Sequence, residues 1–137
     1  MNCLRSSALA LGFILSVSVS GLAGPVTPPT SPVTPVKDAL HFLVIGDWGR
    51  HGEDGQSDTA GRLAAAARKV DPAFVISVGD NFYPNGVASV DDPAWQASFE
   101  DVYTDHALHT DWYVVLGNHD YRGNPQAQID YSKRSRR

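Results

Sequence analysis

The sequence predicts an α/β fold in which parallel strands alternate with helices. Three apolar runs begin at Leu40, Pro72 and Trp112, and each ends in a glycine followed by a polar residue. The runs are rich in Val, Ile, Leu and Phe and do not alternate with polar residues, which is typical of strands buried on both faces of a parallel sheet. A segment with helical periodicity lies between each pair of runs. This order predicts a βαβαβ unit with right-handed crossovers.

Two helices are expected between the strands. The first follows Ser57 or Asp58, either of which can be its N-cap, and runs to Val70. The second covers residues 91–103, with Asp92 as its N-cap before a proline at the first helical position. Both segments place apolar side chains at helical spacing, so each is expected to pack one face against the sheet.

The first 37 residues are expected to precede the folded domain. Residues 1–23 combine one arginine, an apolar run and small residues, which is the layout of a secretory signal peptide. A membrane anchor is the alternative, although the run is short for a bilayer span. Residues 24–37 interleave prolines with Thr, Ser and Val, which predicts an extended linker. The domain is then expected over residues 38–137, in a protein that is secreted or periplasmic.

Polar residues follow all three strands at the same end. Asp47, Asp80 and Asn118 each come directly after a glycine, and Tyr83 follows shortly after Asp80. Because parallel strands end at one edge of the sheet, these side chains are expected to meet there. Carboxylate, amide and phenol oxygens suit hard or borderline cations, and two such metals bind a phosphoryl group in many hydrolases. A single Gly-Asp pair is also common in ordinary turns, but three strand ends of this kind favour a metal site.

The motifs GDWG, GDNFY and GNHDYRGN, in this order, resemble those of the calcineurin-like metallophosphoesterase superfamily. More narrowly, they resemble the purple acid phosphatases of the small, tartrate-resistant type, for which the tyrosine of GDNFY is typical. The resemblance begins near His41 and continues to Arg137. It implies that the chain holds the βαβαβ half of the two-sheet αββα sandwich of this family.

The resemblance also implies a binuclear metal centre. Asp47 would bind Fe(III), Asp80 would bridge the two metals, and Tyr83 would bind the ferric ion as a phenolate. Asn118 would bind the second, divalent ion, which is iron, zinc or manganese in this family. His119 would be a catalytic residue that stays off the metals, where it stabilises charge on the phosphate or protonates the leaving alkoxide.

The family completes its site with three histidines from the later half of the domain. His41, His51, His106 and His109 do not lie in matching motifs. Only His51, in the loop after the first strand, is expected to approach the site; His41 is expected to be structural and the other two to lie on the surface. We therefore expect the chain to be the N-terminal half of the domain and to be inactive by itself.

The expected function is that of an acid phosphatase, which hydrolyses small phosphate monoesters with metal-activated water. The net charge of −4 gives no indication of nucleic-acid binding, and no membrane association is expected after signal cleavage. Two alternatives remain. One is a phosphodiesterase or nucleotidase of the same superfamily, against which Tyr83 argues. The other is a non-catalytic exported relative that binds metal or phosphate. Asp120 and Tyr121 are expected to have supporting roles.

Overall fold

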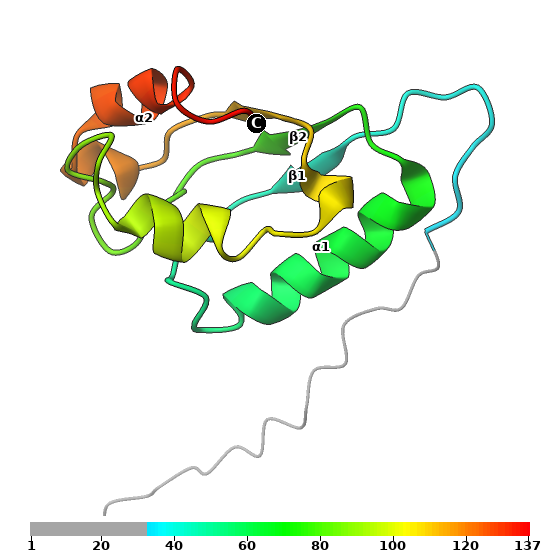
Figure 1. Ribbon diagram of the computed structural model, residues 1–137, viewed down its shortest axis with the longest axis horizontal. Helices are drawn as coiled ribbons and strands as arrows, with labels where there is room; N and C mark the ends of the chain where they lie inside the picture. The colour runs from blue at the N-terminus through cyan, green and yellow to red at the C-terminus, as the bar shows by residue number, and fades with distance from the viewer. Residues whose placement is uncertain (1–32) are drawn as a thin grey trace, which may run out of the picture. The chain divides into compact units, whose positions relative to one another are not determined.

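The computed structural model describes residues 33–137, and the order of its elements confirms the predicted strand–helix alternation (Figure 1). The strands β1 (Leu43–Ile45), β2 (Phe74–Ser77) and β3 (Asp111–Val114) form one parallel sheet in the order β1-β2-β3. The predicted signal peptide and most of the predicted linker lie outside the described residues. Over residues 33–137, no helix is both long and apolar enough to cross a membrane.

The helix α1 (Gln56–Val70) connects β1 to β2 and starts earlier than predicted. Its N-cap is Gly55, with φ of 81° and no side-chain cap, so the prediction of Ser57 or Asp58 as the N-cap is wrong. The physical reason lies in Gln56, whose Oε1 accepts hydrogen bonds from the backbone N–H groups of Arg50 and Gly52, both at 2.8 Å. The loop before α1 thus folds around the side chain of Gln56. Gly55, directly before it, takes the left-handed conformation that glycine adopts readily.

The connection from β2 to β3 is less regular than predicted. Its main element is the π-helical turn η1 (Gln96–Glu100), and a short 3₁₀ turn, η2 (His106–Leu108), follows. The carboxylate of Asp92 accepts from the N–H of Ala94 at 2.9 Å, whereas the N-cap of η1 itself is Trp95, which makes no side-chain cap hydrogen bond. The expectation of one regular helix over residues 91–103 is wrong, because the N–H of Asp101 bonds back five residues rather than four.

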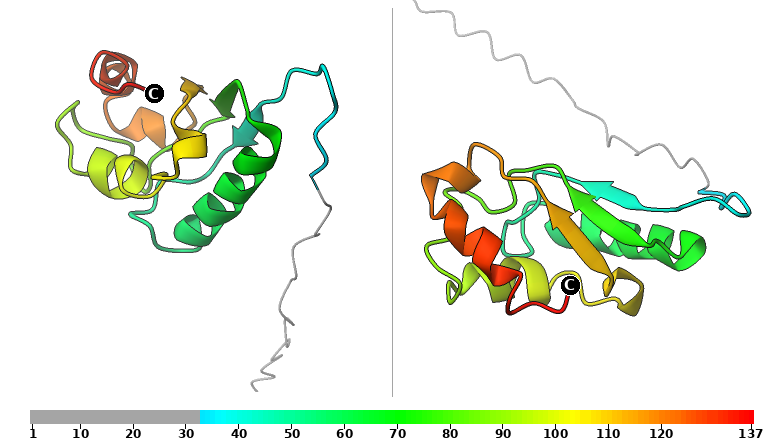
Figure 2. Two further views of the ribbon diagram at one scale, coloured as in Figure 1. Left: turned by 45° about the vertical axis from the view of Figure 1, so that its right-hand side comes forward. Right: turned by 90° about the horizontal axis from the view of Figure 1, so that it is seen from above.

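Two short elements follow β3 that the sequence analysis did not predict. They are the 3₁₀ turn η3 (Asp120–Arg122) and the helix α2 (Pro125–Tyr131). The side chain of Asn124 accepts from the N–H of Ala127 and caps α2, and the proline occupies its first turn. Together these elements carry the chain from the end of β3 back toward η1 (Figures 1 and 2).

The core lies on one face of the sheet, where α1 and η1 pack (Figure 2). Trp48 is central to it and is 4% exposed. Its ring centroid lies between 5.1 and 6.2 Å from those of four buried aromatic residues, Phe82, Phe99, Tyr103 and Trp112. Because Trp48 directly follows Asp47, the packing of the core fixes the loop that carries a predicted metal ligand.

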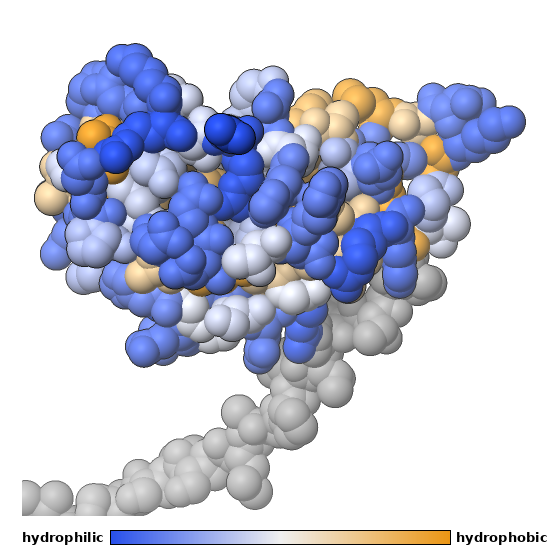
Figure 3. All heavy atoms as spheres, in the orientation of Figure 1, coloured by the Kyte–Doolittle hydropathy of each residue, from blue (hydrophilic) through white to orange (hydrophobic). Residues whose placement is uncertain are grey.

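The other face of the sheet is open in the described part of the chain. Val44 is 53% exposed and Tyr113 is 58% exposed, and Phe42 stacks on Phe74 beside them. Seen from above, the three strands lie uncovered, and apolar side chains gather along the upper side of the molecule (Figures 2 and 3). The strands are covered on one face only over residues 33–137, because both crossovers pass over the same face.

The C-terminal helix is joined to η1 by a contact that depends on pH. The ring of Tyr131 stacks on that of Trp95 with centroids 3.6 Å apart, and its hydroxyl donates to Glu100 Oε1 at 3.0 Å. Burial and this hydrogen bond raise the pKa of Tyr131 from 10.0 to about 12. A raised pKa means that the contact stabilises the folded state below pH 10.0 and is lost as the pH rises to about 12.

We therefore predict that Tyr131→Phe reduces stability at neutral pH and makes the free energy of unfolding fall less steeply between about pH 10 and 12. Denaturant unfolding followed by tryptophan fluorescence measures both effects. Part of the fall will remain, since burial also raises the pKa of Tyr103 to about 12. Tyr121→Phe is the control, because Tyr121 is 67% exposed. An unchanged slope in Tyr131→Phe would contradict the assignment.

Candidate metal centre

The loops after β1 and β2 lie side by side at the carboxyl end of the sheet. The N–H of Asp47 donates to Gly79 O at 3.1 Å, and the N–H of Trp48 donates to Asp80 O at 3.3 Å. Asp47 and Asp80 also have φ angles of 57° and 51°, a left-handed conformation that few residues other than glycine adopt.

One phenol brings the two carboxylates together. The hydroxyl of Tyr83 donates to Asp47 Oδ1 at 2.5 Å and lies 3.1 Å from Asp80 Oδ2. Burial, together with these two carboxylates, raises the pKa of Tyr83 well above its usual range. The pKa of Asp80 is lowered, chiefly because the backbone N–H of His119 donates to its Oδ1 at 2.9 Å. The side-chain oxygens of Asp47, Asp80 and Tyr83 thus lie together, with the phenol proton of Tyr83 between the two carboxylates.

The loop after β3 approaches the same carboxylate. A Cβ placed on Gly117 would lie 2.1 Å from Asp80 Oδ1, so only glycine permits this approach. Asn118 follows, between two residues that both lie against Asp80. Its side chain is exposed and makes no hydrogen bond within residues 33–137. The structure thus joins Asp47, Asp80 and Tyr83 by hydrogen bonds and places the backbone of Asn118 next to them.

His119 is held beside the oxygen donors by its ring. The ring centroid lies 4.3 Å from that of Tyr83, and Nδ1 lies 2.6 Å from Pro84 O. A carbonyl oxygen only accepts, so this contact assigns the proton to Nδ1. Arg122 Nη1 lies 3.2 Å from the same nitrogen. Because both nitrogens then carry a hydrogen, this contact is not a hydrogen bond. The other nitrogen, Nε2, makes no hydrogen bond within the described residues.

The remaining histidines take no part in this cluster. His51, which was expected to approach the site, is exposed, and its backbone N–H donates to Ser98 Oγ at 3.0 Å. His41 Nε2 accepts from the N–H of Val36 at 3.1 Å, in line with the structural role expected of it. His106 and His109 are exposed, as expected.

Two residues near the site were missed or undervalued from the sequence. Arg50 places its guanidinium carbon 3.8 Å from the centroid of the Tyr83 ring, where it adds positive charge beside two carboxylates. Its only sequence signal is its position directly after GDWG. Asp120, which was expected to have a supporting role only, is 0% exposed. Its position in GNHD gives no indication of that burial.

The chemistry of the donor set fits hard cations. Two carboxylates, a phenol and an amide are all oxygen donors. Within residues 33–137, no three His, Cys, Asp or Glu side chains form a metal-binding cluster, so the set relies on Tyr83 and Asn118 for its other oxygens. A small crevice of about 90 Å³ lies next to Asp47 and Arg50.

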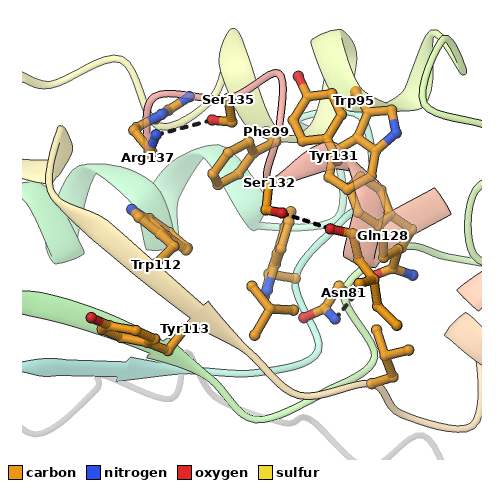
Figure 4. Close-up of a pocket in the computed structure, with 15 residues that line it drawn as sticks. Asn81, Trp95, Phe99, Trp112, Tyr113, Gln128, Tyr131, Ser132, Ser135 and Arg137 are labelled. Carbon is orange, nitrogen blue, oxygen red and sulfur yellow. Dashed lines mark hydrogen bonds between the residues drawn. The ribbon is translucent and has the colours of Figure 1, made fainter. Parts of the chain in front are cut away.

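A larger cavity, of about 320 Å³, lies between β3, η1 and α2 (Figure 4). Seven of its fifteen lining residues are aromatic, with Trp95, Phe99 and Trp112 among them. None of the predicted metal ligands lines it, and neither does His119. We therefore place the chemistry at the strand ends and not in this cavity.

The described chain is an α/β domain that gathers carboxylate and phenol oxygens at the carboxyl ends of parallel strands, as the sequence predicted. The family model of the calcineurin-like phosphoesterases matches residues 40–137, and the chain belongs to this family. The resemblance expected from the three motifs is therefore confirmed, as is the mixed α/β fold of a partial domain.

The chain is similar to curated purple acid phosphatases. It is 52% identical to purple acid phosphatase 4 of Arabidopsis thaliana over 97 residues, which are 71% of this chain and 29% of that protein. It is 45% identical to the human tartrate-resistant acid phosphatase type 5 over 106 residues, which are 72% of this chain and 32% of that protein. The chain thus spans less than a third of the length of these relatives.

A solved structure shares the fold. It is described as "GAP50 the anchor in the inner membrane complex of Plasmodium", and the match has a TM-score of 0.61 at 35% identity. The match covers 66% of this chain and 29% of the other.

The close approach of Gly117 to Asp80 can be tested by substitution. We predict that Gly117→Ala destabilises the protein by about 1–3 kcal/mol, because the new Cβ must displace the carboxylate of Asp80 or the loop around it. Gly61→Ala is the matched control, since Gly61 lies in α1 with nothing within 4 Å of an added Cβ. It is expected to stabilise by about 0.5–1 kcal/mol. Denaturant unfolding measures both, and equal effects would refute the close approach.

Proposed function

We propose that the complete protein is an exported acid phosphatase that hydrolyses small phosphate monoesters at a binuclear metal centre. The observation that carries this proposal is the contact of the Tyr83 hydroxyl with Asp47 and Asp80, which gathers three oxygen donors from two strand-end loops. Membership of the calcineurin-like phosphoesterase family and the identity to purple acid phosphatases support it. The signal-peptide layout of residues 1–23 supports export.

The donors suggest how the metals are held. Asp47, Asp80 and Tyr83 would hold Fe(III), and Asp80 and Asn118 would hold a divalent iron, zinc or manganese ion. The hydroxyl proton of Tyr83 lies between the carboxylates of Asp47 and Asp80, and a bound cation would replace this proton. When bound, such a metal pair activates water and offsets negative charge on the phosphoryl oxygens. The three further histidines that the resemblance implies are proposed to come from outside residues 1–137.

His119 is the proposed catalytic residue of the chain itself. The contact between Nδ1 and Pro84 O, together with the packing of the ring on Tyr83, fixes the imidazole. Nε2 is then free, and once the imidazole is protonated it can donate a hydrogen bond to the phosphate or a proton to the leaving alkoxide. Arg50, with its guanidinium over Tyr83, adds positive charge that favours the approach of an anionic substrate.

One observation favours a second candidate, a non-catalytic relative. The solved structure that shares this fold is described as an anchor rather than as an enzyme. Assays of the complete, metal-loaded protein with an aryl phosphate and an aryl phosphodiester separate the possibilities. Turnover of the monoester supports the proposal, a preference for the diester supports a phosphodiesterase, and metal binding without turnover of either supports the non-catalytic candidate.

The role of Tyr83 predicts a visible colour. In the complete protein loaded with iron, we expect a tyrosinate-to-iron charge-transfer absorption that Tyr83→Phe abolishes, because the phenolate oxygen is removed. Tyr121→Phe is the control, since Tyr121 is 67% exposed and lies outside the cluster of oxygen donors. A band that survives in Tyr83→Phe would rule out this residue as the iron ligand.

The role of His119 predicts a loss of rate without a loss of metal. We expect His119→Ala to lower kcat for an aryl phosphate by about 10²–10⁴-fold, the usual contribution of a general acid. The charge-transfer absorption should persist, because His119 is not a proposed ligand. His109→Ala, at an exposed position, is the control. If His119→Ala instead removed the metal, the residue would be a ligand.

A further inference from the structure

Asp120 is a wholly buried carboxylate beside the candidate site. It is 0% exposed, and no lysine, arginine or histidine forms an ion pair with it within residues 33–137. A buried charge without a counter-ion is costly unless hydrogen bonds replace the water that it has lost. The groups that donate hydrogen bonds to Asp120 therefore show which parts of the chain its carboxylate holds.

Five N–H donors surround this carboxylate. Oδ1 accepts from the backbone N–H groups of Asn81 and Phe82, both at 3.1 Å, and from Gln128 Nε2 at 2.8 Å. Oδ2 accepts from the backbone N–H of Gly117 at 2.8 Å, and lies 3.0 Å from Asn81 N and 3.3 Å from Asn81 Nδ2. Both oxygens are satisfied, and three of the donors are backbone groups.

The backbone donors lie directly beside predicted metal ligands in the sequence. Asn81 and Phe82 are the two residues between Asp80 and Tyr83, and Gly117 directly precedes Asn118. One carboxylate thus holds the backbone on which three of the four predicted metal ligands stand. The N–H of His119 in turn donates to Asp80 Oδ1, so the loops after β2 and β3 each bind a carboxylate of the other.

The network continues beyond the two loops. Asn81 is also 0% exposed; its Nδ2 donates to Val115 O at 2.9 Å and to Gln128 Oε1 at 3.1 Å, as Figure 4 shows for Gln128. Its Oδ1 accepts from Ser77 Oγ, which in turn accepts from Trp48 Nε1 at 2.8 Å. The loop of Asp47 is therefore linked to the same buried network through its neighbour Trp48.

We propose that Asp120 is a positioning residue, which holds Asp80, Tyr83 and Asn118 in the geometry that binds the metals. This inference rests on the proposed metal centre. Residues that orient metal ligands typically contribute 10–100-fold to metal affinity. A carboxylate that only stabilised the fold would change the free energy of unfolding and leave the metal affinity of the folded protein unchanged.

The test uses Asp120→Asn in the complete protein. The substitution keeps the shape of the side chain but turns an NH₂ group toward N–H donors that need an acceptor. In the metal-free protein, amide hydrogen exchange should accelerate at His119, whose acceptor is Asp80 and not Asp120, while Val75 in β2 keeps its protection. Iron titration followed by the tyrosinate absorption should show an affinity lower by about 10–100-fold.

Asp130→Asn is the matched control, since the Asp130 carboxylate lies in α2, is partly exposed and is bonded only by nearby residues, chiefly Lys133. Where Asp120→Asn fails to fold, Gln128→Met removes one side-chain donor to Asp120, and with it the Oε1 acceptor of Asn81 Nδ2, and leaves the three backbone bonds to Asp120 in place. It should lower iron affinity less than Asp120→Asn and in the same direction.

The inference is overturned if a folded variant loses stability but keeps wild-type exchange at His119 and wild-type iron affinity. A wild-type protein that binds no iron would overturn the proposed metal centre and the metal part of this inference. Faster exchange at His119 in Asp120→Asn would still support the coupling of the two loops in that case. The two failures are therefore distinguishable.

Discussion

The arrangement of the candidate site depends on a crossed pair of hydrogen-bonded carboxylates. Asp80, after β2, accepts from the N–H of His119, and Asp120, after β3, accepts from the N–H groups of Asn81 and Phe82. Each loop therefore accepts hydrogen bonds from backbone N–H groups of the other. If either loop moves, a carboxylate or an N–H group loses its partner. Such a cost, about 1–3 kcal/mol for each buried group, makes the two loops behave as one unit.

The hydrophobic core fixes the third loop in a different way. Trp48 follows Asp47 directly, packs among the buried aromatic rings and donates its indole N–H to Ser77 at the end of β2. Burying an aromatic ring of this size contributes several kcal/mol, so the backbone of Asp47 is held by packing where Asp80 is held by hydrogen bonds. The open face of the sheet does not enter this arrangement, because every one of these contacts lies at the strand ends or on the face that α1 covers.

The strands and the gathering of Asp47, Asp80 and Tyr83 could be predicted from the sequence, because unbroken apolar runs that end in glycine indicate parallel strands whose ends share one edge of a sheet. The start of α1 could not, since it depends on Gln56 accepting from two N–H groups of a loop that forms only in the fold. The π-helical turn of η1 and the burial of Asp120 could not be predicted from the sequence either. Both depend on neighbours distant in sequence, and a single aspartate carries no local signal that it will be enclosed.

The donor set also explains why an amide, and not a third carboxylate, stands after β3. Asp47 and Asp80 already share one phenol proton, and Asp120 adds a third negative charge close behind them. Like charges about 4 Å apart repel by roughly 1 kcal/mol in water and by several times that near a protein interior. An aspartate in place of Asn118 would increase this repulsion and oppose the approach of an anionic phosphate. In the proposed metal centre, an amide would supply an oxygen ligand without either cost and would leave the imidazole of His119 beside it for the substrate.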